Sequence, residues 1–170
     1  MVGRLIDRMK SEFGDDRKRV CHALRVLEFA RGIQRADGGS LRVVVAAAIL
    51  HDIGIPAAER KHGSAAAKHQ EAEGPPIARR ILEEAGLDES DTEHVCKIVA
   101  SHHSGGLIDT PEFRAVWDAD VIVNWLDGRR RRPSEAEMRE RLRTKAGLDA
   151  AREQFGMGHT AGENVADSDG

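Results

Sequence analysis

The stretch VVVAAAILHDIG, residues 43–54, decides how this chain folds. Its first eight residues carry no polar side chain, so a helix built from them is apolar on every face and must be surrounded by protein. His51 and Asp52 follow directly, at the end of this buried segment. A buried imidazole and a buried carboxylate need partners, because an unpaired charge inside a protein is costly. We look for those partners among four residues elsewhere in the chain, which are His22, His102, His103 and Asp120.

The composition is that of a globular protein of single-domain length. The 170 residues are 40% hydrophobic and 32% charged, which argues against a disordered or fibrous chain. Aromatic residues make up only 4% and tyrosine is absent, so the core must be built mainly from Leu, Ile, Val and Ala, which suits packed helices. The net charge of −3 and a pI near 6.2 argue against a stable nucleic-acid partner.

The cysteines and the apolar segments indicate a cytoplasmic protein. Cys21 and Cys96 fall in expected helices without CxxC spacing, which favours reduced, buried thiols over a disulfide framework. The N-terminal MVGRLIDRMK lacks the apolar core of a signal peptide, and no apolar run approaches the length of a membrane span. We therefore expect no membrane partner.

Helical periodicity recurs along the whole chain. The expected helices cover residues 3–13, 17–36, 41–54, 77–87, 92–104 and 112–128, with one more around Met138, Leu142, Leu148 and Phe155. Asp15 or Asp16 is the expected N-cap of the second helix, and Ser40 that of the third. The polar segment 58–74 is expected to be helix and loop at the surface, broken by Gly74-Pro75-Pro76.

Neither an internal repeat nor a strand-like alternation interrupts this pattern, so the expected fold is all-α. The predicted domain covers residues 1–156, and the small polar tail at 157–170 is expected to be disordered. The run Arg129–Arg132 could attract a polyphosphate or nucleic acid, although a solvated charge run after a helix is the commoner situation.

The helical geometry turns several histidines and aspartates inward. His22 lies on the apolar stripe of its helix, and His102 lies on the apolar face of the helix at 92–104, with His103 at the edge of that face. In the helix at 112–128, Asp120 lies on the apolar stripe, whereas Asp118 is turned roughly 140–160° away from its centre. Asp120 is therefore the expected inward aspartate, and Asp118 is expected to be exposed or to lie behind the ligands.

This residue set predicts a metal site. Imidazole nitrogens and carboxylate oxygens suit a divalent transition metal such as Mn²⁺, Fe²⁺, Co²⁺, Ni²⁺ or Zn²⁺, and suitable cysteine ligands for a structural zinc are lacking. Four protein ligands on an octahedral ion leave positions for water or substrate. Such open positions favour chemistry over a purely structural role.

The order and spacing of these residues resemble the HD superfamily of metal-dependent phosphohydrolases, whose signature is H…HD…D on a helical bundle. The resemblance covers roughly residues 15–128 and is carried by His22, the HDIG at 51–54 and Ala119-Asp120. The segments HQEAEGPPIARRILEEAGL and VCKIVASHHS further resemble a subgroup of small stand-alone HD proteins. The resemblance implies a single-domain helical bundle.

The resemblance also implies a ligand set. One metal ion is expected on His22, His51, Asp52 and Asp120. In relatives with two metals, the aspartate that matches Asp52 bridges the ions, and His102 and His103 match a downstream pair that could bind the second ion. A further histidine normally precedes the sequence that corresponds to GPPIA at 74–78. This chain has Gln70, Glu71 and Glu73 there, with His69 just upstream, so the second metal stays open.

The expected activity is hydrolysis of a phosphate ester of a small molecule or nucleotide by metal-activated water. Asp52 is expected to orient or deprotonate the water, and His102 and His103 to neutralise the leaving oxygen or the phosphate. His103 equally fits a surface residue near a helix end. Asn124, one turn after Asp120, is expected to hydrogen-bond within the site.

Two other functions stay open. A di-iron oxygenase of the same superfamily would need a complete second ligand set, and a non-catalytic module that binds a nucleotide or metal would need an output partner. The sequence does not define the metal, the natural substrate, the oligomeric state, for which a homodimer is one option, or the roles of Glu71 and Glu73.

Overall fold

The computed structural model describes residues 1–106, 108–128 and 130–157, and in these ranges the chain forms helices and no strands. The helices in chain order are α1 (Val2–Phe13), α2 (Arg17–Asp37), α3 (Leu41–Leu50), α4 (Ile55–His62), α5 (Ala67–Ala85), α6 (Glu89–Val99), α7 (Pro111–Leu126), α8 (Glu135–Arg141) and α9 (Lys145–Gln154). The all-α prediction is confirmed. The tail at 158–170 and Arg129 lie outside the described residues, and the predicted domain limits stay a prediction.

The core is organised around α3, as its composition requires. All eight residues from Val43 to Leu50 are buried, and α3 packs against α1, α2, α6 and α7. The Ser40 hydroxyl accepts a hydrogen bond from the backbone N–H of Val43 and so caps this helix. Burial on every face explains why α3 needs no polar face of its own.

The apolar stretch Leu41–His62, which includes α3 and α4, is long and apolar enough to cross a membrane by length and composition alone. The expectation that no run reaches this length was therefore wrong. Its most apolar window is 83% buried inside the protein, so packing in the core accounts for its hydropathy.

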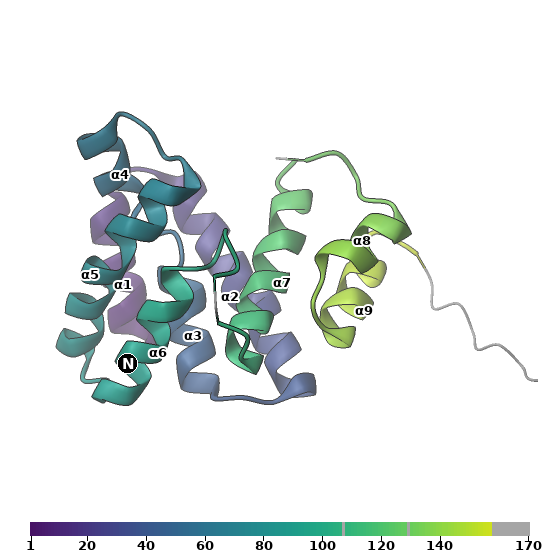
Figure 1. Ribbon diagram of the computed structural model, residues 1–170, viewed down its shortest axis with the longest axis horizontal. Coiled ribbons are helices and arrows are strands. Elements are labelled where there is room, and N and C mark those ends of the chain that lie inside the picture. The colour runs from purple at the N-terminus through teal and green to yellow at the C-terminus, as the bar shows by residue number, and fades with distance from the viewer. Residues whose placement is uncertain (107, 129, 158–170) are drawn as a thin grey trace, which may run out of the picture.

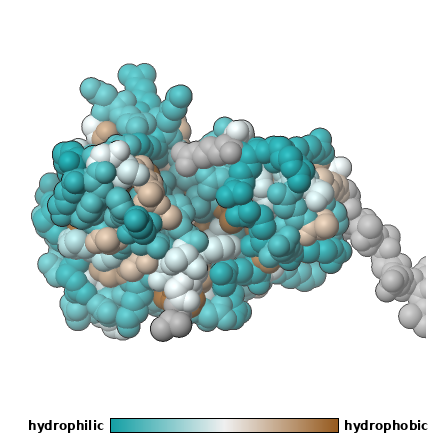
Figure 2. All heavy atoms as spheres, turned by 45° about the horizontal axis from the view of Figure 1, so that its top comes forward, coloured by the Kyte–Doolittle hydropathy of each residue, from teal (hydrophilic) through white to brown (hydrophobic). Residues whose placement is uncertain are grey.

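The other helices lie in three groups along the molecule (Figure 1). α5 packs against α4 and α6 on one side of the molecule, while α2 packs against α3 and α7 in the middle. α8 and α9 form a pair at the other end, where α9 contacts both α2 and α7. The face shown in Figure 2 is mainly hydrophilic, with small scattered apolar areas.

Four local expectations need correction. α5 continues through Pro75 and Pro76, because it packs against α4 and α6 along its length and tertiary packing outweighs the two missing N–H donors. The helix expected at 41–54 ends at Leu50, and Pro56 lies in the first turn of α4, which is the position where proline costs no hydrogen bond. The C-terminal segment forms two helices, not one, and Cys21 is exposed.

Candidate metal centre

Two histidines and two aspartates from three parts of the chain meet in the interior. The Nε2 atom of His22, on α2, lies 2.9 Å from Asp120 Oδ1 on α7 and 3.7 Å from Asp52 Oδ2. The Nε2 atom of His51 lies 3.4 Å from Asp52 Oδ2 and 3.6 Å from Asp120 Oδ1. All four residues are buried. The structure thus brings together the four residues that the sequence analysis selected as ligands of one metal.

His102 joins this cluster through the other oxygen of Asp52. Its Nε2 atom lies 3.4 Å from Asp52 Oδ1, and its side chain is buried. The expected helix at 92–104 is wrong at its end, because α6 stops at Val99 and His102 and His103 occupy the turn that follows. The turn still points His102 inward, so the placement of its side chain agrees with the sequence analysis.

Hydrogen bonds fix which nitrogen each imidazole presents to the cluster. Nδ1 of His51 lies 2.9 Å from the carbonyl oxygen of Ala48, and Nδ1 of His102 lies 2.7 Å from that of Val99. A carbonyl oxygen can only accept, so both Nδ1 atoms must be protonated donors. The Nε2 atoms are therefore directed at the carboxylates, which is the tautomer that a metal-binding histidine needs.

The chemistry of these atoms fits a divalent cation. The Nε2 atoms of His51 and His102 are buried without a hydrogen-bond partner among the described residues, which a protein rarely tolerates unless another group satisfies them. Ligands about 2.1 Å from one ion lie about 3.0–3.4 Å apart at octahedral or tetrahedral angles. The separations from His51 and His102 to Asp52 are close to that range.

The electrostatics also favour a cation. Burial alone would lower the pKa of His51, but the Asp52 carboxylate and then Asp120 raise it to about 9. Burial opposes ionisation of Asp52 and Asp120, yet their pKa values are lowered, chiefly by His51 and His102 for Asp52 and by His22 for Asp120. The two carboxylates thus stay ionised and hold positive charge next to them.

His22 has a different partner, which the sequence analysis missed. Its Nδ1 atom donates to Oδ2 of Asp127 at 3.0 Å, and Asp127 also forms an ion pair with Arg25. Asp127 follows the last residue of α7 and was taken only as part of a helix end. Its separation of seven residues from Asp120, about two helical turns, was the signal that could have identified it. The expected hydrogen bond of Asn124 is confirmed, since its Nδ2 atom donates to Asp120 Oδ1 at 2.9 Å.

A second group of potential ligands adjoins the first. Donor atoms of Asp52, His102 and His103 lie close enough together to hold another ion. Gln70 donates to the carbonyl oxygen of Ala65 and accepts from Nε2 of His103 at 3.2 Å, which leaves Nδ1 of His103 as its lone-pair nitrogen.

The acidic residues near Gln70 do not join this group. Glu71 accepts hydrogen bonds from the backbone N–H groups of His103 and Ser104, so it holds the turn in place. Glu73 pairs instead with Lys61 and His62 at the surface.

Asp118 corrects another expectation. It is fully buried, not exposed, and it accepts hydrogen bonds from the backbone N–H groups of Arg143 and Thr144 at 2.7 and 2.9 Å. The helical wheel correctly turned it away from Asp120. The α8–α9 pair, which periodicity alone does not place, covers that far face of α7.

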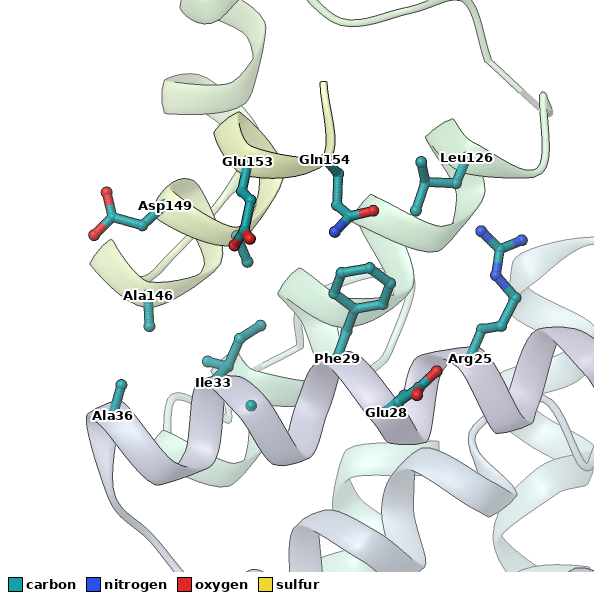
Figure 3. Close-up of a pocket in the computed structure, with 12 residues that line it drawn as sticks. Arg25, Glu28, Phe29, Ile33, Ala36, Leu126, Ala146, Asp149, Glu153 and Gln154 are labelled. Atoms are coloured by element: carbon teal, nitrogen blue, oxygen red, sulfur yellow. The ribbon is translucent and has the colours of Figure 1, made fainter. Parts of the chain in front are cut away.

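A cavity of about 260 Å³ opens onto the cluster. Its walls include side chains of the candidate centre, of α5, of α7 and of the C-terminal segment, which are Ala67, His102, His103, Trp117, Asp120, Val121, Asn124, Arg130 and Arg141. A larger cavity of about 740 Å³ lies between α2, α7 and α9 (Figure 3), where Phe29 and Ile33 point into a space without any of the clustered ligands. Of these two cavities, the smaller one combines access with candidate ligands. A further cavity of about 430 Å³ borders the cluster from the side of His22 and Asp127.

Comparison with known proteins identifies one family and one similar fold. The family model for the HD domain matches residues 19–151. The fold resembles the 1.45 Å crystal structure of a predicted HD superfamily hydrolase from an uncultured Thermotogales bacterium, with a TM-score of 0.68 and 24% sequence identity over 89% of this chain and 83% of that chain. At 24% identity, this similarity is evidence for a shared fold and not for a shared activity. No curated protein matches this chain at a significant level.

Proposed function

This chain belongs to the HD-domain family, and on that premise we propose that it is a metal-dependent phosphohydrolase acting on a small phosphorylated molecule or nucleotide. One observation carries the proposal: imidazoles from α2 and from the turns after α3 and α6 direct Nε2 toward the carboxylates of Asp52 and Asp120. A merely structural ion pair would not leave two of these buried nitrogens without a partner.

The proposed ligands of the metal are His22, His51, Asp52 and Asp120. When bound there, a divalent ion lowers the pKa of a water molecule and polarises a phosphoryl oxygen. Asp52 contacts both His51 and His102, so one of its oxygens can orient the attacking water while the other stays in the ligand set. Its lowered pKa makes it a weak base, so orientation is its main role.

His102 and His103 lie where the cavity meets the cluster. We assign to them the stabilisation of negative charge on the phosphoryl group or the leaving oxygen by hydrogen bonding. Burial and the neighbouring His102 lower the pKa of His103, so at neutral pH this residue is uncharged and contributes through the Nε2 proton that it donates to Gln70 in this structure. The same two histidines with Asp52 are the proposed site if a second metal binds.

The test is metal analysis of protein purified without added ions, followed by a panel of phosphate esters with and without a chelator. We expect at least one transition metal per chain, and phosphate release that the chelator abolishes. The variant His51→Ala should lose both metal and activity, by about 10²-fold or more in rate. The matched control His62→Ala changes an exposed histidine that pairs with Glu73, and it should keep both.

Other outcomes separate the alternatives. Phosphate release that ignores the chelator and survives His51→Ala would refute the proposal. Two irons per chain with oxygen consumption would instead identify an oxygenase, for which the Asp52, His102 and His103 group would supply the second ion site. Metal and nucleotide binding without turnover would identify a binding module.

A further inference from the structure

The cavity over the candidate centre has a basic wall that the metal chemistry does not use. His102, His103 and Asp120 contribute one part of its lining, and Arg130 and Arg141 contribute another. Both arginines come from the segment after α7. The cavity therefore places guanidinium groups from the C-terminal segment beside the candidate metal centre.

The backbone of Arg141 is held firmly at this position. The indole N–H of Trp117 donates to the carbonyl oxygen of Arg141 at 3.0 Å. Two residues later, the backbone N–H of Arg143 donates to Asp118, and its guanidinium lies 4.2 Å from the centre of the Trp117 ring. Consecutive residues of α7 thus fix the end of α8, which limits where the Arg141 side chain can reach.

The Arg141 side chain has no anionic partner among the residues that the structure describes. Its Nε atom is buried and makes no hydrogen bond there, although leaving a buried donor without an acceptor is energetically costly. Arg139, on the same helix, pairs with Glu135 at 2.9 Å. Arg130 is exposed and likewise forms no ion pair with a described residue. An unpaired, partly buried guanidinium in a cavity wall is suited to an anionic ligand.

We propose that Arg141, assisted by Arg130, binds a second phosphoryl group of the substrate, next to the one that is hydrolysed. This inference rests on the proposed phosphohydrolase function and narrows its substrates to compounds with two adjacent phosphoryl groups, such as a diphosphate. The metal ligands and the two histidines already serve the reacting phosphoryl group. The cavity of about 260 Å³ is slightly smaller than the roughly 300–1,000 Å³ of sites that enclose drug-sized ligands, which suits the two phosphoryl groups of such a compound.

The test measures binding without turnover. Metal-loaded protein is titrated by calorimetry with methylenediphosphonate and with methylphosphonate, which carry two and one phosphonate groups and are not hydrolysed. The wild type should bind the diphosphonate about 10- to 100-fold more tightly, the range that one or two charge-assisted hydrogen bonds provide. Arg141→Gln should remove this preference and leave methylphosphonate binding unchanged. Arg139→Gln, on the exposed side of α8, should behave as the wild type does.

Steady-state kinetics supply a second readout. With inorganic pyrophosphate, Arg141→Gln should raise KM about 10-fold or more with a smaller change in kcat, and Arg141→Lys should lie between Gln and the wild type because it keeps the charge without the planar fork. With a simple phosphomonoester neither variant should change KM. Thermal melting of each variant verifies that it is folded.

Two results would overturn the inference. One is a wild type without a preference for the diphosphonate, and the other is an Arg141→Gln variant that weakens both phosphonates equally, which would place the guanidinium on the reacting phosphoryl group. The metal analysis and the phosphate-ester panel described under the proposed function separate these results from a failure of that function, because a protein that binds no metal or releases no phosphate fails at that earlier step.

Discussion

At the scale of single residues, two histidines whose Nε2 atoms lack a hydrogen-bond partner among the described residues are oriented in the same way. His51 and His102 each lie just past the end of a helix, and each donates its Nδ1 proton to the carbonyl oxygen three residues earlier. The last carbonyls of a helix lack intrahelical donors, so they are free to accept this proton. His22 lies inside α2, where the carbonyls are already used, and it takes its Nδ1 acceptor from Asp127 instead.

Because His22 depends on Asp127 as its Nδ1 acceptor, a substitution of Asp127 should change the affinity of the site for metal. The substitution Asp127→Asn keeps the size of the side chain but removes the charge that faces Nδ1 of His22, so the basicity of Nε2 should fall. We expect the dissociation constant for the metal to rise about 10- to 100-fold, measured by competition with a chromophoric chelator.

The control for this prediction is Asp109→Asn. Asp109 pairs with Arg114 at the surface, as Asp127 pairs with Arg25, but it makes no contact with a candidate ligand. The substitution Asp109→Asn should leave the metal affinity unchanged. Equal affinities in both variants would show that Asp127 serves α2 packing and not the metal.

At the scale of elements, the turn that carries His51 and Asp52 is held by a close backbone approach. Gly54 packs against the backbone of α5, where a Cβ atom would meet the backbone nitrogen of Gly74 at 2.7 Å and also the carbonyl oxygen of Gln70. The φ of Gly54 is −74°, so space and not backbone conformation demands glycine here. The same approach brings Gln70 to His103, and so α5 contributes to the candidate centre.

The substitution Gly54→Ala should therefore destabilise the protein by overpacking. We expect a loss of about 1–3 kcal/mol in the free energy of unfolding, measured by urea denaturation, because backbone atoms cannot move aside as a flexible side chain can. The matched control is Gly32→Ala in α2, where nothing lies within 4 Å of the added methyl group. That variant should be stabilised by about 0.5–1 kcal/mol through helix propensity. A stable Gly54→Ala protein would mean that α5 can shift.

The start of α3 depends on an ionised carboxylate from α7. Glu112 is buried and accepts a hydrogen bond from the backbone N–H of Ser40 at 2.6 Å. Burial opposes its ionisation, but this hydrogen bond and its own backbone N–H hold the pKa of Glu112 below its usual value of 4.5. A lowered pKa means that the ionised form contributes stability above pH 4.5, which is lost as the pH falls through the lower folded value.

We therefore expect Glu112→Gln to unfold about 1–2 kcal/mol more easily than the wild type at pH 7, since hydrogen bonds to charged groups are the stronger ones. The difference should shrink as the pH falls below 4.5, where the wild-type side chain also becomes neutral. Denaturant titrations at several pH values measure this, and a gap that stays constant down to pH 3 would contradict it.

Local patterns predicted most helices but not the ends that matter for the site. The stripe positions of His22 and Asp120 follow from a helical period, and the structure brings both side chains to one place. The end of α6 at Val99 does not follow from that period, because SHHS has no strong stop signal before Gly105. The continuity of α5 through Pro75 and the closeness of Gly54 to α5 are set by contacts between helices, which no single segment contains.

At the scale of the whole molecule, the C-terminal pair of helices completes the cavity and covers the far side of α7. Asp118 accepts hydrogen bonds from both the backbone N–H and the hydroxyl of Thr144. The same hydroxyl accepts a hydrogen bond from the N–H of Gly147 and caps α9. The buried carboxylate of Asp118, two residues before Asp120, thus holds the α8–α9 pair against α7. Packing at this distance along the chain could not be inferred from periodicity.

The fit at Gly147 allows this link to be tested without touching the candidate centre. A Cβ atom on Gly147 would meet Cβ of Asp118 at 2.8 Å, and Asp118 is fully buried, so Gly147→Ala should push α9 away from α7. We expect a loss of about 1–3 kcal/mol in the free energy of unfolding. The control Gly3→Ala lies in open space on α1 and should be neutral or slightly stabilising.

If α8 carries the substrate-binding Arg141, the folded Gly147→Ala protein should also lose part of its preference for methylenediphosphonate while its metal affinity stays unchanged. A variant that loses stability but keeps the full preference would show that the end of α8 is fixed by Trp117 alone, through its hydrogen bond to the Arg141 carbonyl oxygen.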